Sequence, residues 1–236
     1  MHIVAVSGAN IHHQPCGKSV ELAERMIAAV RELRPDATGE VVALVDKEIR
    51  PCIGCGNCIG TEQCVIADGF EPIYEKLKAA DGLVIVSPHY APIPAKLCAL
   101  LERIESIAFL NRWRDESHPF ALEGKPVALI AHGGVAGEQL RRFYYDVVLV
   151  PLANAFGFPA NASIVKTTEW PHIGVITGPS AVETGERFPV QRYDDEAIQQ
   201  KLRTLALAMV ATTISPEAKM RTCLLYTSDA ADEEDS

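Results

Sequence analysis

Gly82-Leu83-Val84-Ile85-Val86-Ser87-Pro88-His89-Tyr90 is the stretch that decides the fold, because an unbroken apolar run leads directly into a loop that begins with serine and proline. A strand with one solvated face would alternate apolar and polar residues, whereas Leu83 to Val86 are all apolar. Continuous apolar strands are typical of parallel sheets that carry helices on both faces. The stretch therefore predicts a central strand of an α/β sheet, with a loop at its carboxyl end.

Short apolar runs alternate with longer segments of helical period along the rest of the chain, which indicates successive strand-helix-strand units. We predict strands over residues 2–6, 39–45, 82–87, 126–131 and 162–166. Apolar residues spaced three and four positions apart predict helices over about 19–33, 69–79, 94–109, 138–156 and 194–212. The expected architecture is a single α/β domain over residues 1–212, with its sheet sandwiched between helices.

Composition and charge limit the classes of protein to which the chain can belong. Its 236 residues, 48% hydrophobic and 22% charged, suffice for one domain with a buried core. No apolar run is long enough to cross a bilayer and no basic leader precedes the first strand, so we expect a cytoplasmic protein without a membrane partner. The chain has no basic surplus, which argues against nucleic acid as a partner.

The last residues, 223–236, look unlike the helical pattern before them and resemble the translation of a sequencing adapter. We therefore expect them to be an artefact of sequence assembly, within a tail that spans 213–236. They hold five acidic residues and no basic one, so without them the formal net charge of −9 becomes −4. A genuine acidic tail is the alternative.

The most specific chemical signal is a run of four cysteines with the spacing C-x2-C-x2-C-x5-C, formed by Cys52, Cys55, Cys58 and Cys64. Gaps of two residues let one tight loop turn three sulfurs toward a common point, as in the cysteine runs of [4Fe-4S] proteins. Gly54, Gly56 and Gly60 lie between them, where positive φ lets backbone N–H groups point at sulfur. The run predicts a cluster in a loop over residues 51–68.

Other uses of these thiols stay open. Structural zinc normally requires a second pair of ligands roughly a dozen residues away, and this chain has none. Disulfides are disfavoured in the reducing compartment that we expect. Free thiols that line a pocket are the remaining alternative.

Ligands of open α/β sheets bind at the carboxyl ends of the strands, which directs attention to the loops after the first, third and fourth strands. The first loop leads into a helix whose N–H groups can grip a phosphate. Its candidate phosphate-binding residues are Ser7, Asn10, Gly17, Lys18 and Ser19. The sequence argues against a Walker-type phosphate loop, because position 12 is histidine where that motif requires glycine. An ordinary capped turn is the alternative.

The other two loops have the composition of a site for a flat ring. Three prolines stiffen the loop after the third strand, which carries the aromatic Tyr90. Glycines in the loop after the fourth strand would let a ring lie close to the backbone.

These features resemble the NADPH-dependent FMN reductase superfamily of flavodoxin-like proteins, and the cysteine run resembles its iron-sulfur flavoprotein branch. The resemblance extends to about residue 212. It is specific for the family's Ser-Pro-x-Tyr and Leu-Leu-x-Arg motifs, which are met by Ser87, Pro88, Tyr90, Leu100, Leu101 and Arg103. It is equally specific for Cys-x-Gly-Cys-x-x-Cys, met by Cys52, Gly54, Cys55 and Cys58. The first loop matches only loosely, and the family's Asp-Asp after the last cysteine is Asp68-Gly69 here.

The resemblance implies a doubly wound five-stranded sheet in the order 2-1-3-4-5, in three layers, and a homodimer or homotetramer. It implies FMN held by its phosphate on the first loop. The ring would contact Pro88, His89, Tyr90, Ala91, Pro92, Gly133, Gly134 and Gly137. NAD(P)H would be the transient hydride donor, so we assign no catalytic side chain. A [4Fe-4S] cluster would pass electrons to quinone, flavin or protein acceptors.

Three other functions stay open: a cluster-free NADPH-dependent FMN or quinone reductase, a non-enzymatic flavodoxin-like electron carrier, and a zinc-stabilised binding module. The proline-containing segment 167–193 is expected to be an irregular arm that covers the flavin or a neighbouring subunit.

Overall fold

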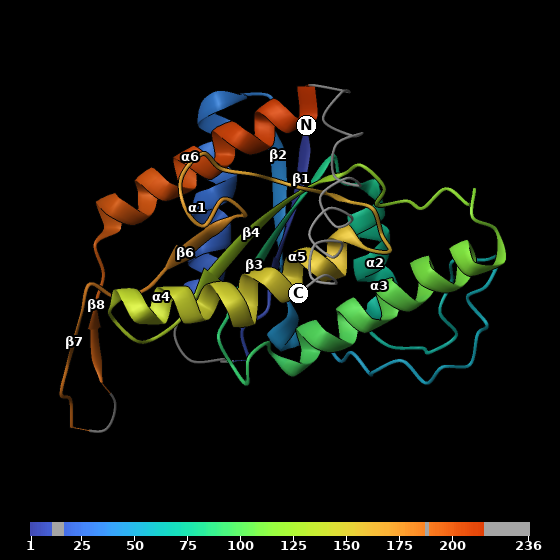
Figure 1. Cartoon of the computed structure of the whole chain (residues 1–236), viewed down its shortest axis with the longest axis horizontal. Helices are drawn as coiled ribbons and strands as arrows, with labels where there is room; N and C mark the ends of the chain where they lie inside the picture. The colour runs from blue at the N-terminus through green and yellow to red at the C-terminus, as the bar shows by residue number, and fades with distance from the viewer. Residues whose placement is uncertain (11–16, 187–188, 215–236) are drawn as a thin grey trace, which may run out of the picture.

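The computed structural model describes residues 1–10, 17–186 and 189–214 (Figure 1). The expected adapter-derived stretch, most of the tail, and residues 11–16 of the first loop lie outside this range. No helix in the described part is long and apolar enough to cross a membrane.

A parallel sheet forms the centre of the molecule, with its main strands in the order β2-β1-β3-β4-β5. The predicted order 2-1-3-4-5 and the flavodoxin-like fold are therefore confirmed. The five strands are β1 (His2–Ser7), β2 (Thr38–Ala43), β3 (Gly82–Pro88), β4 (Pro126–His132) and β5 (Ser163–Ile164). Every residue of β3 and β4 is buried, as the continuous apolar runs require.

The fifth position of the sheet is divided between two short strands, whereas the sequence predicted one strand over 162–166. β5 pairs with the start of β4, and β6 (Val175–Thr177) pairs with its end. Between them the chain leaves the sheet and returns. Gly174, with φ of 74°, begins the return at a point where a Cβ would overlap the carbonyl oxygen of Leu129. This close approach favours glycine.

Helices cover both faces of the sheet and give the expected three layers (Figure 1). One face of β3 packs Val84 and Val86 against α1 (Lys18–Leu33) and α6 (Asp195–Ile214). The other packs Leu83 and Ile85 against the second helical layer. That layer contains α2 (Phe70–Ala79), α3 (Ala95–Arg114) and α5 (Val150–Gly157), and a short 3-10 turn, η1 (Leu44–Asp46), follows β2.

The helix predicted over 138–156 is interrupted. α4 (Glu138–Tyr144) passes into a π-helical turn, η2 (Tyr145–Leu149), before α5 begins. Pro151 lies in the first turn of α5 and has no N–H to donate back along an unbroken helix. The change of helix type next to this proline is consistent with that missing donor.

The segment 167–193 is more regular than expected. It contributes β6 to the sheet and ends in an exposed antiparallel hairpin of β7 (Ala181–Glu183) and β8 (Val190–Arg192). Figure 1 shows this hairpin projecting beyond the helices at one end of the sheet. We call residues 178–186 and 189–193 the arm.

Candidate functional site

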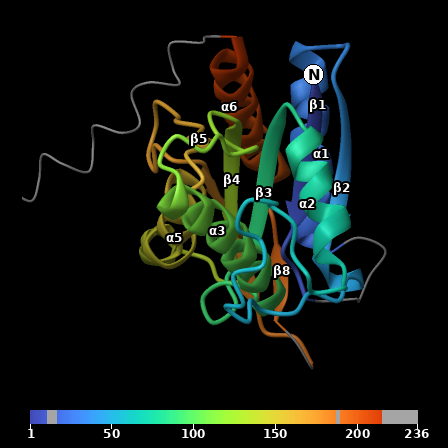
Figure 2. The same ribbon diagram turned by 90° about the vertical axis from the view of Figure 1, so that its right-hand side faces the viewer.

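Three loops leave the carboxyl edge of the sheet from neighbouring strands. Pro88 at the end of β3 lies opposite His132 at the end of β4. Backbone pairing continues into the loops, where Gly8 N–H donates to Val86 O at 2.9 Å and His89 N–H donates to His132 O at 2.8 Å. In Figure 2 the strands run downward from the N-terminus, and the cysteine loop and β8 lie toward their lower, carboxyl ends.

The first turn of α1 presents donors at this edge. Gly17 is the N-cap residue, and no side chain caps the helix within the described residues. Ser19 is fully buried, and its Oγ lies 2.6 Å from Nε2 of His132. Lys18 instead directs its amine to both carboxylate oxygens of Glu21, at 2.9 Å each. The turn therefore offers backbone N–H groups and a buried hydroxyl, while Lys18 is paired within its own helix.

The other predicted phosphate-binding residues lie on either side of the undescribed part of the loop. Ser7 is buried at the end of β1, and Asn10 is exposed. The residues that connect Asn10 to Gly17 lie outside the described range, so the structure places the two ends of this loop and not its middle.

His132 is a residue to which the sequence prediction gave no role. Its side chain is buried, and burial followed by the positive charge of Lys18 lowers the pKa of the imidazole to about 4. The ring is therefore neutral at pH 7 and carries a hydrogen on one nitrogen only. No local pattern could have marked it, because its partner Ser19 is 113 residues away in the sequence.

The loop after β3 makes a tight turn with a strained residue. Tyr90 N–H donates to Pro92 O at 2.9 Å, and Ala91 adopts a left-handed φ of 52°. Tyr90 is half-buried, and burial raises the pKa of its phenol. The ring of His89 packs edge-on against Phe143 with 5.0 Å between centroids. His89 therefore packs on α4, and Ala91 and Pro92 are exposed.

The glycines after β4 make room for protein side chains. A Cβ on Gly133 would overlap the phenol of Tyr144, and one on Gly134 would lie 2.5 Å from Nε2 of Gln191. That amide donates to Gly134 O at 3.1 Å. Gly137 has φ of 117° and precedes α4 with nothing within 4 Å of its Cβ position. In this structure the close approach that Gly133 and Gly134 permit is made by Tyr144 and the arm.

The end of the arm lies against the first turn of α1 as well. The amine of Lys18 sits 4.1 Å from the ring centroid of Tyr193, and the Tyr193 hydroxyl donates to Gln191 at 2.7 Å. Burial raises the pKa of Tyr193, and the nearby Glu21, Tyr144 and Tyr90 raise it further. Tyr193 therefore lies beside the first turn of α1, next to Gln191, which is bonded to the loop after β4.

The glycines of the cysteine loop have the backbone geometry that the spacing predicted. Gly54, Gly56 and Gly60 have φ of 65°, 71° and 79°. The N–H of Gly54 points at Sγ of Cys52, 3.4 Å away. Backbone N–H groups directed at sulfur are typical of sites that hold thiolates or sulfide.

The four thiols fit a metal by their chemistry but are not gathered into a ligand set. All four are free. Burial raises the pKa of Cys58, and Cys64, Cys52 and Cys55 raise it further. Among the described residues, which include all four cysteines, no three histidine, cysteine or acidic side chains are grouped to hold a metal ion.

A buried ion pair anchors both ends of the cysteine loop. Arg103 of α3 and Asp68 are each 1% exposed, with Nη1 of Arg103 2.8 Å from both carboxylate oxygens. Arg103 also donates to the carbonyls of Arg50 and Ile66, at 3.4 Å each. Asp68 accepts hydrogen bonds from Arg50 N–H at 2.8 Å and Phe70 N–H at 3.0 Å. The residues just before and just after the cysteines are thus tied to one helix.

Two further side chains of α3 hold the backbone between these ends. Oδ1 of Asn111 accepts from Gly60 N–H at 2.5 Å, and its Nδ2 donates to Cys58 O at 3.1 Å. Glu102 accepts from Cys52 N–H at 3.0 Å. The cysteine loop is therefore fixed by α3 along its length.

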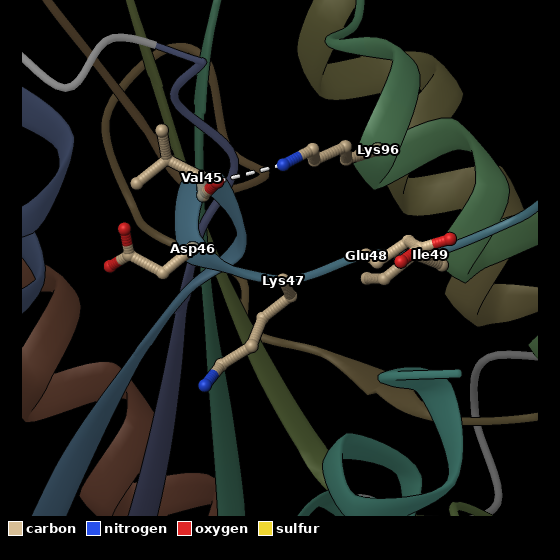
Figure 3. A pocket seen from close by; sticks show the side chains of 6 residues that line it. All are labelled: Val45, Asp46, Lys47, Glu48, Ile49 and Lys96. Atoms are coloured by element: carbon tan, nitrogen blue, oxygen red, sulfur yellow. Dashed lines mark hydrogen bonds between the residues drawn. The ribbon is translucent and has the colours of Figure 1, made fainter.

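A hollow of about 510 Å³ lies between the end of β2 and the start of α3 (Figure 3). It is lined by Val45, Asp46, Lys47, Glu48, Ile49 and Lys96. Lys96 reaches across it to donate to Val45 O at 2.7 Å. Its lining mixes both charges and includes none of the predicted cofactor-binding residues, so we do not assign the flavin to it.

A family model described as NADPH-dependent FMN reductase matches residues 1–161 of the chain. The iron-sulfur flavoprotein of Methanosarcina thermophila is 34% identical over 137 residues, which cover 57% of this chain and 64% of that protein. An iron-sulfur flavoprotein of Methanocaldococcus jannaschii is 33% identical over 104 residues, which cover 44% of this chain and 51% of that protein. The chain thus spans less than two-thirds of the length of either relative.

Solved structures share the fold at low identity. An oxidoreductase from Corynebacterium diphtheriae superposes with a TM-score of 0.54 at 16% identity, covering 90% of this chain and 96% of that one. This likeness concerns the fold and agrees with the order of the strands.

Proposed function

Because the chain belongs to the NADPH-dependent FMN reductase family, we propose that it is an FMN-dependent NAD(P)H oxidoreductase of the iron-sulfur flavoprotein type. The observation that carries the proposal is the meeting of three loops at one edge of the sheet, beside the first turn of α1, which no side chain of the described residues caps. A helix N-terminus favours a phosphate through its free N–H groups and its dipole.

The residues of this edge have distinct tasks in the proposal. The first turn of α1 and Ser19 bind the FMN phosphate. The loop of Tyr90 and the glycines after β4 contact the flavin ring, which at Gly133 and Gly134 requires Tyr144 and Gln191 to move aside. The arm excludes water from the ring. FMN, when bound, supplies hydride acceptance from NAD(P)H, so these residues need only bind and orient.

A [4Fe-4S] cluster is the second part of the proposal. Cys52, Cys55, Cys58 and Cys64 would hold it, which requires the loop to close further around the metal. The positive-φ glycines and the two relatives that are named iron-sulfur flavoproteins support this assignment. The cluster would supply one-electron transfer toward quinone, flavin or protein acceptors.

The proposal also includes a cytoplasmic location and a homodimer or homotetramer. The exposed hairpin of the arm offers an edge that a second copy could cover.

Anaerobic turnover tests the enzymatic part. The FMN-loaded full chain is mixed with NADPH or NADH, and the loss of oxidised-flavin absorbance is followed before and after a quinone is added. We expect bleaching and then repeated oxidation of the nicotinamide. A non-enzymatic carrier would show no steady-state turnover, which would refute the proposal.

A cysteine variant separates the proposal from a cluster-free reductase. We expect C55S/C58S to lose iron while it keeps FMN and its bleaching by the nicotinamide. C98S is the matched control, because Cys98 is an exposed thiol outside the run. Equal iron in C55S/C58S and C98S would exclude these cysteines as ligands.

A further inference from the structure

The contact between His132 and Ser19 joins the end of β4 to the first turn of α1. Ala128 and Ile130 of β4 pack on the face of the sheet that α1 covers. His132 follows at the same two-residue spacing, so its side chain points to that face as well. Its ring reaches Ser19, with 2.6 Å between Nε2 and Oγ, and both side chains are buried.

This contact has two possible hydrogen arrangements, with opposite consequences for a ligand. If Ser19 donates its hydroxyl hydrogen to the ring, it turns only lone pairs toward the helix N-terminus. If Nε2 donates to Ser19, the hydroxyl hydrogen is free to donate to a ligand. An anion at the N-terminus of α1 is stabilised only by the second arrangement.

The lysine in the first turn of α1 is committed elsewhere. Lys18 is paired with Glu21 and lies over the ring of Tyr193. Among the described residues of this turn, neutral donors are therefore the ones left to bind an anion. A hydroxyl that is held by a buried ring is oriented before the ligand arrives.

On this basis, and resting on the proposed function, we propose that His132 is a positioning residue for the FMN phosphate. Its Nε2–H donates to Ser19 Oγ, and the Ser19 hydroxyl donates to a phosphate oxygen. Ser19 and His132 act on the phosphate of FMN and not on its isoalloxazine ring. They therefore favour FMN over riboflavin, which lacks the phosphate.

Affinities for FMN and riboflavin, measured by equilibrium titration of the apoprotein, test this role. A lost hydrogen bond to a charged group weakens binding about 10- to 100-fold, which is the effect expected of S19A on FMN. H132L should weaken FMN binding about 5- to 10-fold, because the hydroxyl is then unoriented. H132Q should restore most of the affinity, since its amide offers an N–H in place of the ring donor. Riboflavin affinity should be the same in all variants.

S163A is the matched control. Ser163 is also buried, but it pairs with Pro126 at the opposite end of β4. We expect it to leave both affinities unchanged. Parallel losses of FMN and riboflavin affinity in H132L, or H132Q as weak as H132L, would overturn the positioning role.

The wild-type protein provides a second readout that does not depend on a variant folding. Nitrogen NMR of the histidine rings should show His132 protonated at Nε2 when FMN is bound. Protonation at Nδ1 instead would overturn the proposal. Wild-type protein that binds no FMN would refute the proposed function itself, a result distinct from FMN binding that is indifferent to Ser19 and His132.

Discussion

Replacement of Asp68 by asparagine should destabilise the fold more than any charge removal at the surface. The side chain keeps its shape and loses its charge, which leaves the guanidinium of Arg103 buried without a counter-ion. Two carbonyls at 3.4 Å and the ring of Phe70 at 3.9 Å remain as its partners. Nε of Arg103 already lacks a hydrogen-bond partner among the described residues.

We expect D68N to lower the unfolding free energy by about 3 to 5 kcal/mol, because removal of one partner leaves the charge of the other buried and unpaired. This is a large fraction of the roughly 5 to 15 kcal/mol that stabilises a domain. E32Q is the control. It breaks the pair of Glu32 with Arg203 at 3.1 Å, whose side chains are 51% and 53% exposed. We expect that change to cost at most about 1 kcal/mol.

Urea unfolding of the full-length variants provides the measurement, together with hydrogen exchange of residues 50–68. D68N should lower the unfolding free energy and increase exchange throughout the cysteine loop, while E32Q should do neither. A difference of less than about 1 kcal/mol between the two variants would refute the view that this pair anchors the loop.

The same pair predicts a dependence of stability on pH. Burial alone would raise the pKa of Asp68, but hydrogen bonds from Arg50 N–H, Arg103 and Phe70 N–H outweigh it and lower the pKa. A lowered pKa in the folded state stabilises the protein above the unfolded pKa of about 3.9. That stabilisation is lost as the pH falls through the folded value, and D68N should lack this part of the acid sensitivity.

Three further predictions concern other parts of the site. G133A should destabilise the fold by about 1 to 3 kcal/mol and weaken FMN binding, because the new methyl group displaces the ring of Tyr144. A variant with unchanged stability and unchanged FMN affinity would contradict the close packing of Tyr144 on Gly133. G54A should lower the unfolding free energy by about 1 to 2 kcal/mol because of the φ of 65° alone, since nothing lies within 4 Å of the Cβ position. The control G157A, in α5, should be neutral or stabilising. Equal unfolding free energies of the two variants in urea would contradict a strained backbone at Gly54. The pKa of His132 is about 6.5 in the unfolded chain and about 4 in the folded protein. The wild type should therefore lose about 3 kcal/mol more unfolding free energy than H132Q between pH 7 and pH 4. Equal losses in the two proteins would show that the ring is not held neutral.

The order of the sheet and the position of the three loops follow from local sequence. Residues 83–86 are apolar on both sides of the strand because helices cover both faces of the sheet. The burial of this strand can therefore be predicted from its unbroken run of apolar residues. The spacing of the cysteines likewise reflects a local constraint, since each glycine between them takes a conformation that other residues rarely adopt.

Other features depend on contacts that no local pattern records. The division between β5 and β6 is consistent with a close approach of Gly174 to Leu129, and the bond of Ser19 to His132 joins residues 113 positions apart. Gln191 and Tyr193 reach the site only because the returning strand of the arm brings them to Gly134 and Lys18. A sequence pattern of period two or 3.6 carries no information about such pairs.

In the proposed function, one chain carries both FMN and an iron-sulfur cluster. Its most direct test is to purify the protein anaerobically, reconstitute the cluster, and count FMN, iron and acid-labile sulfide per chain. We expect one FMN per chain together with equal amounts of iron and sulfide. A yellow protein that contains FMN and no iron after reconstitution would contradict this expectation.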